Sequence, residues 1–166
     1  HSSMKKKEVK STFYEYTSLS ELNQQQQQLV NHAAKAASDA YAPYSDFYVG
    51  AAVLLENGHI LHASNQENSA FPSGLCAERT AVFYANSQYP NTPVLALAIT
   101  AKKDGTPVKY PIPPCGSCLQ VLLESEKRHH ASMEIILYGT ERIYLAENVE
   151  QFLPYGFTSL NLKGTT

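Results

Sequence analysis

The sequence predicts an α/β fold in which a mixed sheet of about five strands is covered by helices on both faces. Three observations lead to this. A strand–turn–strand pattern is typical of a hairpin, a continuous apolar run at residues 94–100 is typical of a strand buried on both faces, and helical patterns separate the later strands. The 166 residues, of which 43% are hydrophobic and 17% charged, are enough for one domain with a sizeable core.

The first 17 residues carry charge and few periodic apolar positions, which predicts a loose arm ahead of a single domain over residues 18–166. The stretch His1-Ser2-Ser3 before Met4 is typical of an expression-tag remnant. No apolar stretch follows the lysines after Met4, so we expect no secretory signal. No apolar run approaches the roughly 20 residues that span a bilayer. The net charge of −2 offers no attraction to nucleic acid or to an anionic membrane.

The elements follow from periodicity and from turn residues. Ser18 to Glu21 fits a capping box, and apolar residues recur at helical spacing until Pro43 breaks the pattern. The dipeptide Asn57-Gly58 is a hairpin turn signal between two strand-like runs. The predicted order is helix 19–41, strands 47–55 and 60–64, helix 76–87, strand 94–100, helix 115–127, strands 133–138 and 142–145, and helix 147–153.

Three cysteines and one glutamate carry the chemistry of this sequence. Cys76 stands two positions before Glu78, and Cys115 and Cys118 follow at the start of a later predicted helix. Cys118 lies one helical turn after Cys115, on the same face. Three thiolates can hold zinc and leave its fourth position for water, which is the layout of a catalytic site. We therefore expect one Zn²⁺ per chain on the three cysteines, with Glu78 moving protons.

Two other interpretations of these cysteines remain open at this point. A lone buried cysteine is usually small apolar filler, and Cys-Gly-Ser-Cys can be a redox dithiol of the thioredoxin type. The redox interpretation needs a preceding strand and leaves Cys76 unexplained, so zinc is favoured. An odd number of cysteines also suits a reducing compartment such as the cytoplasm, where disulfides are rare.

Four motifs in order resemble the small, homotetrameric class of cytidine deaminases. Zinc deaminases in general combine a cysteine or histidine, a non-ligand glutamate and a later Pro-Cys-x-x-Cys. Here the motifs are Tyr-Ala-Pro-Tyr-Ser-Asp-Phe-Tyr-Val-Gly-Ala-Ala from residue 41, Asn-Gln-Glu-Asn from 65, Leu-Cys-Ala-Glu-Arg-Thr-Ala from 75, and Pro-Cys-Gly-Ser-Cys from 114. The resemblance implies a three-layer α/β/α cytidine-deaminase-like fold. It also implies a role in pyrimidine salvage, by hydrolysis of cytidine and 2′-deoxycytidine to the uridines and ammonia.

The resemblance also implies roles for single residues. Asn65 and Glu67 would hydrogen-bond the ribose 3′-hydroxyl, and a carboxylate there would repel a phosphate, which favours nucleosides over linked nucleic acid. Phe47 would pack against the pyrimidine ring. The Ala77 N–H is expected to donate to the substrate carbonyl or to the attacking oxygen. Arg79 is expected to hydrogen-bond zinc-bound sulfur. Phe71 and Phe157 are expected to lie between subunits of a homotetramer.

The chain departs from the family pattern at two positions. Leu119 stands where an arginine commonly follows the second cysteine of the pair, so one cation beside the thiolates is missing. Phe71 replaces a common tyrosine and lacks its hydroxyl. The alternative functions are an aminonucleoside-antibiotic deaminase of the blasticidin type and a non-catalytic zinc or redox protein. A nucleic-acid editor is disfavoured because no basic patch is evident.

Overall fold

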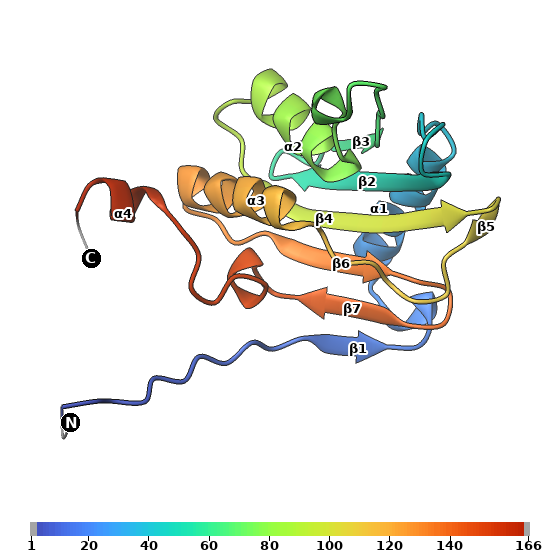
Figure 1. Cartoon of the computed structure of the whole chain (residues 1–166). Coiled ribbons are helices and arrows are strands. Elements are labelled where there is room, and N and C mark those ends of the chain that lie inside the picture. The colour runs from blue at the N-terminus through green and yellow to red at the C-terminus, as the bar shows by residue number, and fades with distance from the viewer. Residues whose placement is uncertain (1–2, 165–166) are drawn as a thin grey trace.

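The fold is a mixed seven-stranded sheet between helices, in a computed structural model that describes residues 3–164 (Figure 1). His1 and Ser2 of the expected tag remnant lie outside the described residues. The strands are β1 (Tyr14–Tyr16), β2 (Phe47–Leu55), β3 (Ile60–Ser64), β4 (Val94–Lys103), β5 (Thr106–Pro107), β6 (Glu134–Tyr138) and β7 (Ile143–Ala146). The helices are α1 (Gln24–Ala37), α2 (Ala77–Gln88), α3 (Gly116–His129) and α4 (Ser159–Leu162), with 3₁₀ turns η1 (Leu19–Glu21), η2 (Phe71–Ser73) and η3 (Val149–Gln151).

The sheet order is β1-β7-β6-β4-β2-β3, with β5 paired to β4. Strands β4 and β6 are parallel and all other pairs are antiparallel, which confirms the predicted mixed sheet. The five predicted strands are all present, and β1 and β5 are additional. Strand β1 escaped prediction because its side chains are largely exposed and show no alternation, and β5 because it is two residues long.

Alternation along β2 divides the core into two layers. Val49, Ala51 and Val53 face one buried cluster, which contains residues of α2 and α3. Ala52 and Leu54 face the other, which contains residues of α1. Figure 1 shows the consequence, with α1 on one face of the sheet and α2 and α3 on the other. The predicted α/β/α layering is therefore confirmed.

The predicted helix over 19–41 is wrong in extent, because the chain divides it into two. The capping box at Ser18 starts only the turn η1, after which the backbone is extended at Leu22. Asn23 then caps α1 through two hydrogen bonds. Asn23 Oδ1 accepts from the Gln26 N–H at 2.8 Å, and Gln26 Oε1 accepts from the Asn23 N–H at 2.9 Å. Tyr41 lies beyond the helix, bridged to Gln66.

The predicted final helix over 147–153 is reduced to η3, and α4 follows it unpredicted. Buried Glu126 on α3 fixes this region, because its carboxylate accepts from the Met133 N–H at 2.7 Å and the Val149 N–H at 3.1 Å. Pro154 then disfavours a continued helix, since it has no N–H to donate. The other predicted boundaries agree with the structure within about three residues.

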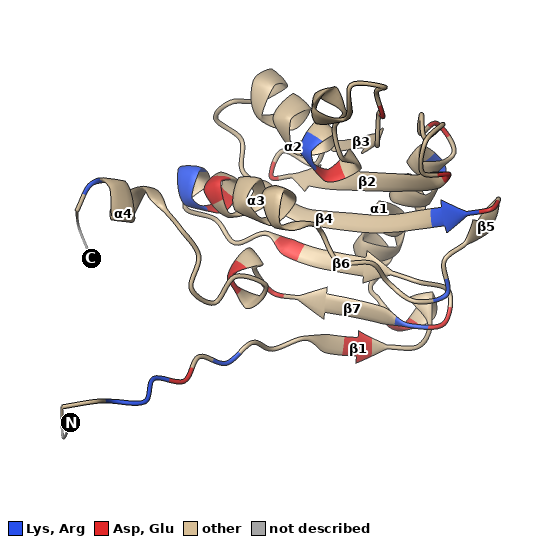
Figure 2. Cartoon of the chain, in the orientation of Figure 1, with Lys and Arg blue, Asp and Glu red and all other residues tan. Residues whose placement is uncertain are grey.

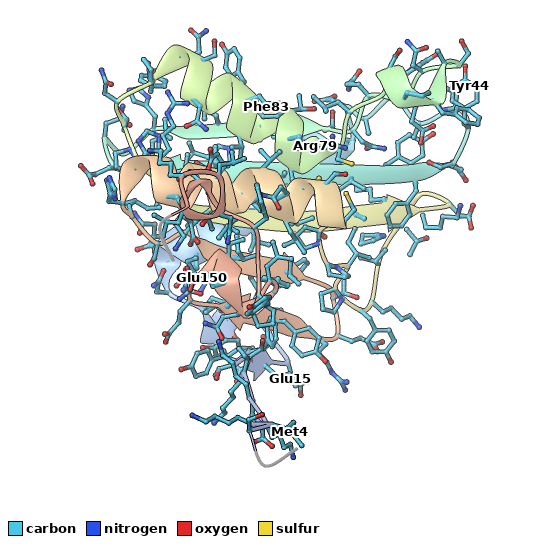
Figure 3. All side chains as sticks on the ribbon, turned by 60° about the vertical axis from the view of Figure 1, so that its left-hand side comes forward. Met4, Glu15, Tyr44, Arg79, Phe83 and Glu150 are labelled. Atoms are coloured by element: carbon cyan, nitrogen blue, oxygen red, sulfur yellow. The ribbon has the colours of Figure 1, made fainter. Side chains whose placement is uncertain are left out.

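Basic and acidic residues are interspersed along the ribbon (Figure 2). The arm from Met4 leads away from the sheet and joins it only at β1, where Glu15 pairs with Tyr144 (Figure 3). Within residues 3–164, no helix combines the length and the apolar character needed to cross a membrane.

Gly50 allows α1 to approach β2 closely. A Cβ at this position would lie 1.9 Å from the carbonyl oxygen of Ala33 and 2.6 Å from the amide nitrogen of Ala37. Both are backbone atoms, so no rotamer change relieves the clash. We expect Gly50→Ala to lower the free energy of unfolding by about 3 kcal/mol, the upper end for overpacking, measured by urea denaturation. Gly116→Ala is the control, because nothing lies within 4 Å of its added Cβ. Equal stability of the two variants would contradict this packing.

Candidate metal centre

The three cysteines converge although Cys76 is far from the others in sequence. Cys76 is the N-cap of α2, Cys115 is the N-cap of α3, and Cys118 is buried in the first turn of α3. Both helices pack on the same face of the sheet, so their N-termini meet there. The three sulfur atoms lie within 4.8 Å of one another. All three thiols are free, as a metal site requires.

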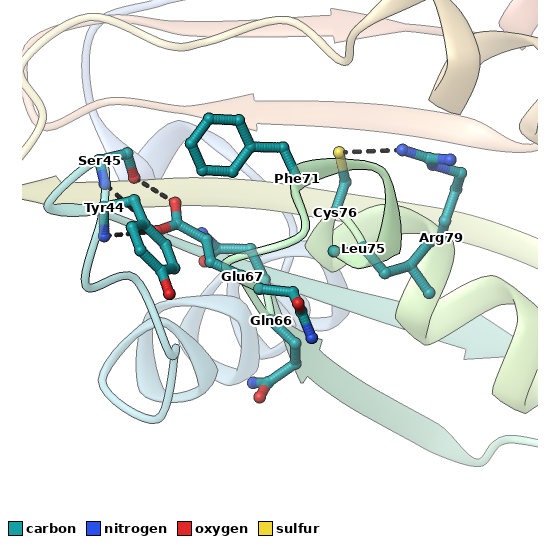
Figure 4. Close-up of a pocket in the computed structure, with 11 residues that line it drawn as sticks. Tyr44, Ser45, Gln66, Glu67, Phe71, Leu75, Cys76 and Arg79 are labelled. Carbon is teal, nitrogen blue, oxygen red and sulfur yellow. Dashed lines mark hydrogen bonds between the residues drawn. The ribbon is translucent and has the colours of Figure 1, made fainter.

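The donor set fits zinc. Tetrahedral zinc with Zn–S bonds of about 2.3 Å separates its sulfurs by about 3.8 Å, which small side-chain movements would reach from the observed spacing. Neither helix start is capped by a side-chain hydrogen bond, so the cysteines lie at two helix N-termini, each with a partial positive charge. A further basic group is present, because Arg79 Nη2 donates to Cys76 Sγ at 3.4 Å (Figure 4). The site therefore combines three thiols with positive charge, which suits three thiolates and a dication.

These neighbours shift the thiol pKa values in opposite directions. The adjacent Cys118 thiol and the Arg79 side chain lower the pKa of Cys76 to about 5, although burial acts against them. The pKa of Cys118 is raised, first by Cys76 and then by burial, because two close thiols resist ionising together. Of these two thiols, Cys76 is the one whose ionised form is favoured before a metal binds.

Arg79 contacts one of the three sulfurs, that of Cys76. Within the described residues, its buried Nε atom has no hydrogen-bond partner. Leu119 of α3, in the position where an arginine is common, is 8% exposed and packs in the buried cluster that α2 and α3 form with the sheet. The guanidinium of Arg79 is therefore the cation that the structure places on the sulfurs.

Glu78 lies in the first turn of α2 and is 6% exposed. Burial is the main cause that raises the pKa of its carboxyl, and the negative charge of Cys76 raises it further. The Cys118 thiol acts in the opposite direction and lowers the pKa. Such a carboxyl can hold a proton at higher pH than an exposed glutamate and can exchange it near the metal position.

A pocket of about 420 Å³ opens beside Cys76 and Arg79. Glu67 and Asn65 contribute to its wall, as do Phe71 and the loop residues Tyr44 and Ser45. Its volume is in the range of small-molecule sites. Figure 4 shows Glu67 at one end and Cys76 at the other, so a ligand in the pocket would lie between a carboxylate and the sulfurs.

The two polar residues expected to bind sugar are held by their surroundings. Asn65 Oδ1 accepts from the Val49 N–H at 2.8 Å, and its Nδ2 donates to the Phe47 carbonyl at 2.9 Å. Glu67 Oε1 accepts from the Tyr44 N–H at 2.9 Å and from the Ser45 N–H at 3.2 Å. Both side chains are therefore oriented before any ligand binds.

Several expected residues do not line this pocket. Phe47 is half-buried and packs against the core, and Ala77 and Glu78 are buried behind the wall at the start of α2. Phe157 is 54% exposed and absent from the wall, although its carbonyl accepts from Gln120 Nε2 at 3.0 Å. Phe71 lines the pocket yet is 74% exposed, with its ring centroid 5.7 Å from that of Tyr44.

The pocket also contains residues that sequence reasoning gave no role. Tyr44, Ser45 and Leu75 were noticed only as parts of motifs. Gln66 bridges to Leu75 through reciprocal N–H···O bonds of 3.0 and 2.9 Å, which fixes the backbone immediately before Cys76. The one sequence feature that marks Tyr44 and Ser45 is the turn Pro43-Tyr44-Ser45 before a strand. A turn sequence does not indicate which residues the turn contacts.

Comparison with known families agrees with this geometry. The family model described as "Cytidine and deoxycytidylate deaminase zinc-binding region" matches residues 23–133, which include all three cysteines and Glu78. The cytidine deaminase of Halalkalibacterium halodurans is 37% identical over 133 residues, 80% of this chain and 94% of that protein. The cytidine deaminase of Sporosarcina psychrophila is 39% identical over 136 residues, 82% of this chain and 93% of that protein.

Solved structures agree as well. The crystal structure of cytidine deaminase from Burkholderia pseudomallei superposes with a TM-score of 0.68 at 31% identity, over 82% of this chain and 100% of that one. The cytidine deaminase structure from Mycobacterium tuberculosis gives a TM-score of 0.64 at 29% identity, over 82% and 99%.

Proposed function

We propose, since the chain belongs to the cytidine deaminase family, that it is a zinc-dependent hydrolase that converts cytidine to uridine with release of ammonia. The observation that carries this is the convergence of three cysteine sulfurs beside a pocket of about 420 Å³, with buried Glu78 in the first turn of the helix that Cys76 caps. We extend the proposal to 2′-deoxycytidine, because the residues assigned to the sugar address its 3′-hydroxyl, which both nucleosides carry. A role in pyrimidine salvage and a cytoplasmic location, suited to three free thiols, follow from it.

Cys76, Cys115 and Cys118 would hold one zinc ion. Zinc, when bound there, would supply Lewis acidity and lower the pKa of a water molecule so that it attacks near neutral pH. Arg79 offsets the charge of the thiolates, because it donates to Cys76 Sγ and its Nε remains available to a second sulfur.

Glu78 would carry the protons of the reaction. It takes one proton from the attacking water and gives it to ring nitrogen 3. It then takes the second proton from the new hydroxyl at carbon 4 and delivers it to the leaving amine as the bond from carbon 4 to nitrogen breaks. The water supplies the oxygen of uridine, and the amine leaves as ammonia. Burial, which raises the pKa of the Glu78 carboxyl, suits a group that must both accept and donate protons.

Substrate binding would use both ends of the pocket. Glu67 accepts from the sugar 3′-hydroxyl, the Asn65 amide hydrogen-bonds the same hydroxyl, and Phe47 packs near the base. The Ala77 N–H, at the uncapped start of α2, donates to the substrate carbonyl or to the attacking oxygen. A 3′-phosphate would meet the Glu67 carboxylate, so free nucleosides are favoured over linked nucleic acid.

The test is turnover by zinc-replete protein. With cytidine we expect loss of absorbance and formation of one uridine and one ammonia per cytidine consumed. The same assay with blasticidin S distinguishes the aminonucleoside alternative, and we expect far slower turnover. Turnover of blasticidin S alone would replace this proposal with the antibiotic deaminase, and no turnover of either would favour a non-catalytic zinc protein.

We also propose a homotetramer whose sites are completed across subunits. Several large aromatic side chains are exposed, among them Phe83 and Tyr84 of α2 and Phe71 in the wall of the pocket. Exposed apolar groups in one region are typical of interaction surfaces. Phe157 is exposed and outside its own pocket, which suits a side chain that reaches the pocket of another subunit.

The assembly prediction has two parts. Light scattering at micromolar concentration should give four times the chain mass of 18.3 kDa. Phe157→Ala should raise KM for cytidine about tenfold, as loss of a packed aromatic does, with unchanged zinc content. Tyr155→Ala is the matched control, because Tyr155 is an exposed aromatic of the same tail whose ring contacts Lys7. A fully active monomer would contradict the shared site.

A further inference from the structure

We propose that Ser45 is a positioning residue that sets both the sugar-binding carboxylate of Glu67 and the backbone of Phe47. This inference rests on the proposed function, because it takes the sugar role of Glu67 as given. It adds a residue to which neither the family motifs nor the expected site assigned a role.

The N–H, the carbonyl and the hydroxyl of Ser45 are all hydrogen-bonded. Its N–H donates to Glu67 Oε1 at 3.2 Å, and its carbonyl accepts from Lys103 Nζ at 2.8 Å. Its hydroxyl donates to Glu67 Oε2 and accepts from the Phe47 N–H at 3.1 Å. The next residue, Asp46, has a left-handed φ of 55°, which only a well-determined turn maintains in a non-glycine residue. The hydroxyl therefore has a fixed place between two residues of the proposed substrate site.

The contacts leave Glu67 with limited acceptor capacity. A carboxylate offers about four acceptor directions, two on each oxygen. Oε1 accepts from the N–H groups of Tyr44 and Ser45, and Oε2 accepts from the Ser45 hydroxyl (Figure 4). One direction remains, on an oxygen at the wall of the pocket. A single hydroxyl donor from a ligand, such as the sugar 3′-hydroxyl, would complete the set.

The same contacts keep the carboxylate ionised. The Ser45 hydroxyl is the largest cause that lowers the pKa of Glu67, and the N–H groups of Tyr44 and Ser45 act in the same direction. An ionised carboxylate accepts from a hydroxyl and offers it no proton, so the polarity of the sugar contact is defined.

The second consequence concerns the base. Side chains hold the Phe47 backbone on both sides of its Cα, because its N–H donates to Ser45 Oγ and its carbonyl accepts from Asn65 Nδ2 at 2.9 Å. Phe47 is the first residue of β2, where a strand end would otherwise fray. One hydroxyl thus links the carboxylate assigned to the sugar with the aromatic residue assigned to the pyrimidine ring.

The experiment compares cytidine with 3′-deoxycytidine, which lacks the hydroxyl that Glu67 would bind. Ser45→Ala should raise KM for cytidine about tenfold, the order expected for one hydrogen bond to a charged group, with kcat within about twofold. With 3′-deoxycytidine only the support of Phe47 is lost, so KM should rise less, by about twofold. Ser45→Thr keeps the hydroxyl and should restore KM, because the side chain is exposed and has room for a methyl group.

Two controls separate the possible failures. Ser38→Ala removes an exposed hydroxyl that accepts from Lys102 Nζ at 2.7 Å outside the site, and it should leave KM unchanged. Glu67→Ala tests the proposed function itself, and it should raise KM for cytidine while changing little with 3′-deoxycytidine. If Glu67→Ala shows this contrast and Ser45→Ala raises KM equally on both substrates, or on neither, the Ser45 inference is overturned and the sugar role of Glu67 stands. If Glu67→Ala affects both substrates equally, the sugar role fails first and the Ser45 inference with it.

Discussion

Glu78→Gln should lose most of the turnover of cytidine while it keeps zinc and binds substrate. The amide has nearly the shape of the carboxyl but cannot take a proton from water or deliver one to the ring or the amine. General acid–base catalysis by one group contributes roughly 10²–10⁴-fold, and Glu78 is assigned several transfers, so kcat should fall by at least about that range. Steady-state kinetics with metal analysis of the same sample measures both effects.

The matched control is Glu126→Gln. Glu126 is also a buried glutamate, on the neighbouring helix α3, but its carboxylate accepts from Met133 and Val149 outside the pocket. The amide oxygen of glutamine can still accept, so turnover should stay near that of the unaltered protein. If Glu78→Gln retains activity within about tenfold of the unaltered protein, the proton carrier is a different group.

Cys118→Ser should lose the metal and with it the activity. Cys118 is fully buried and its sulfur lies within 4.8 Å of the other two, so no water or surface group can take its place as a ligand. A serine hydroxyl is a poor zinc ligand beside thiolates. Loss of an outer partner of a metal ligand already costs 10–100-fold in affinity or activity, so loss of a ligand should cost more than about 100-fold.

Metal content after dialysis against a chelator measures this, and thermal unfolding adds a second readout. Bound zinc stabilises the folded state by mass action, so the chelator should lower Tm of the unaltered protein and leave Tm of Cys118→Ser nearly unchanged. Ser117→Ala is the control, because Ser117 is the exposed neighbour that shares the same turn. Full zinc retention by Cys118→Ser would show that the metal site is elsewhere.

The sequence predicted those parts of the fold in which local signals agree with packing. The hairpin of β2 and β3 was predicted with its observed boundaries, because Asn57-Gly58 and two apolar runs point to the same turn. The helices that present the cysteines were predicted nearly as closely. Cys76 and Cys115 open α2 and α3, and helices that pack on one face of a sheet bring their N-termini together.

The failures have two causes, which are a local helix cap that the apolar pattern concealed and tertiary contacts that leave no local trace. Asn23 caps α1 only because its side chain bonds Gln26, and within a continuous polar and apolar pattern it resembled helix interior. Strand β1 forms because it pairs with β7 in an antiparallel arrangement, although Tyr14 and Glu15 are exposed. In the sequence, Ser45 is only part of a turn motif. In the structure, its hydroxyl lies between Glu67 and Phe47 and is bonded to both. Such long-range bonds cannot be inferred from periodicity or turn residues.

X-ray absorption at the zinc edge, on freshly purified protein without substrate, tests the metal centre most directly. Three sulfur ligands at about 2.3 Å and one oxygen or nitrogen ligand at about 2.0 Å are predicted, with one zinc per chain, because Cys76, Cys115 and Cys118 would leave one position open. Four sulfur ligands would indicate a closed structural site, and protein without zinc but with a disulfide between Cys115 and Cys118 would indicate a redox dithiol. Either result would contradict the account.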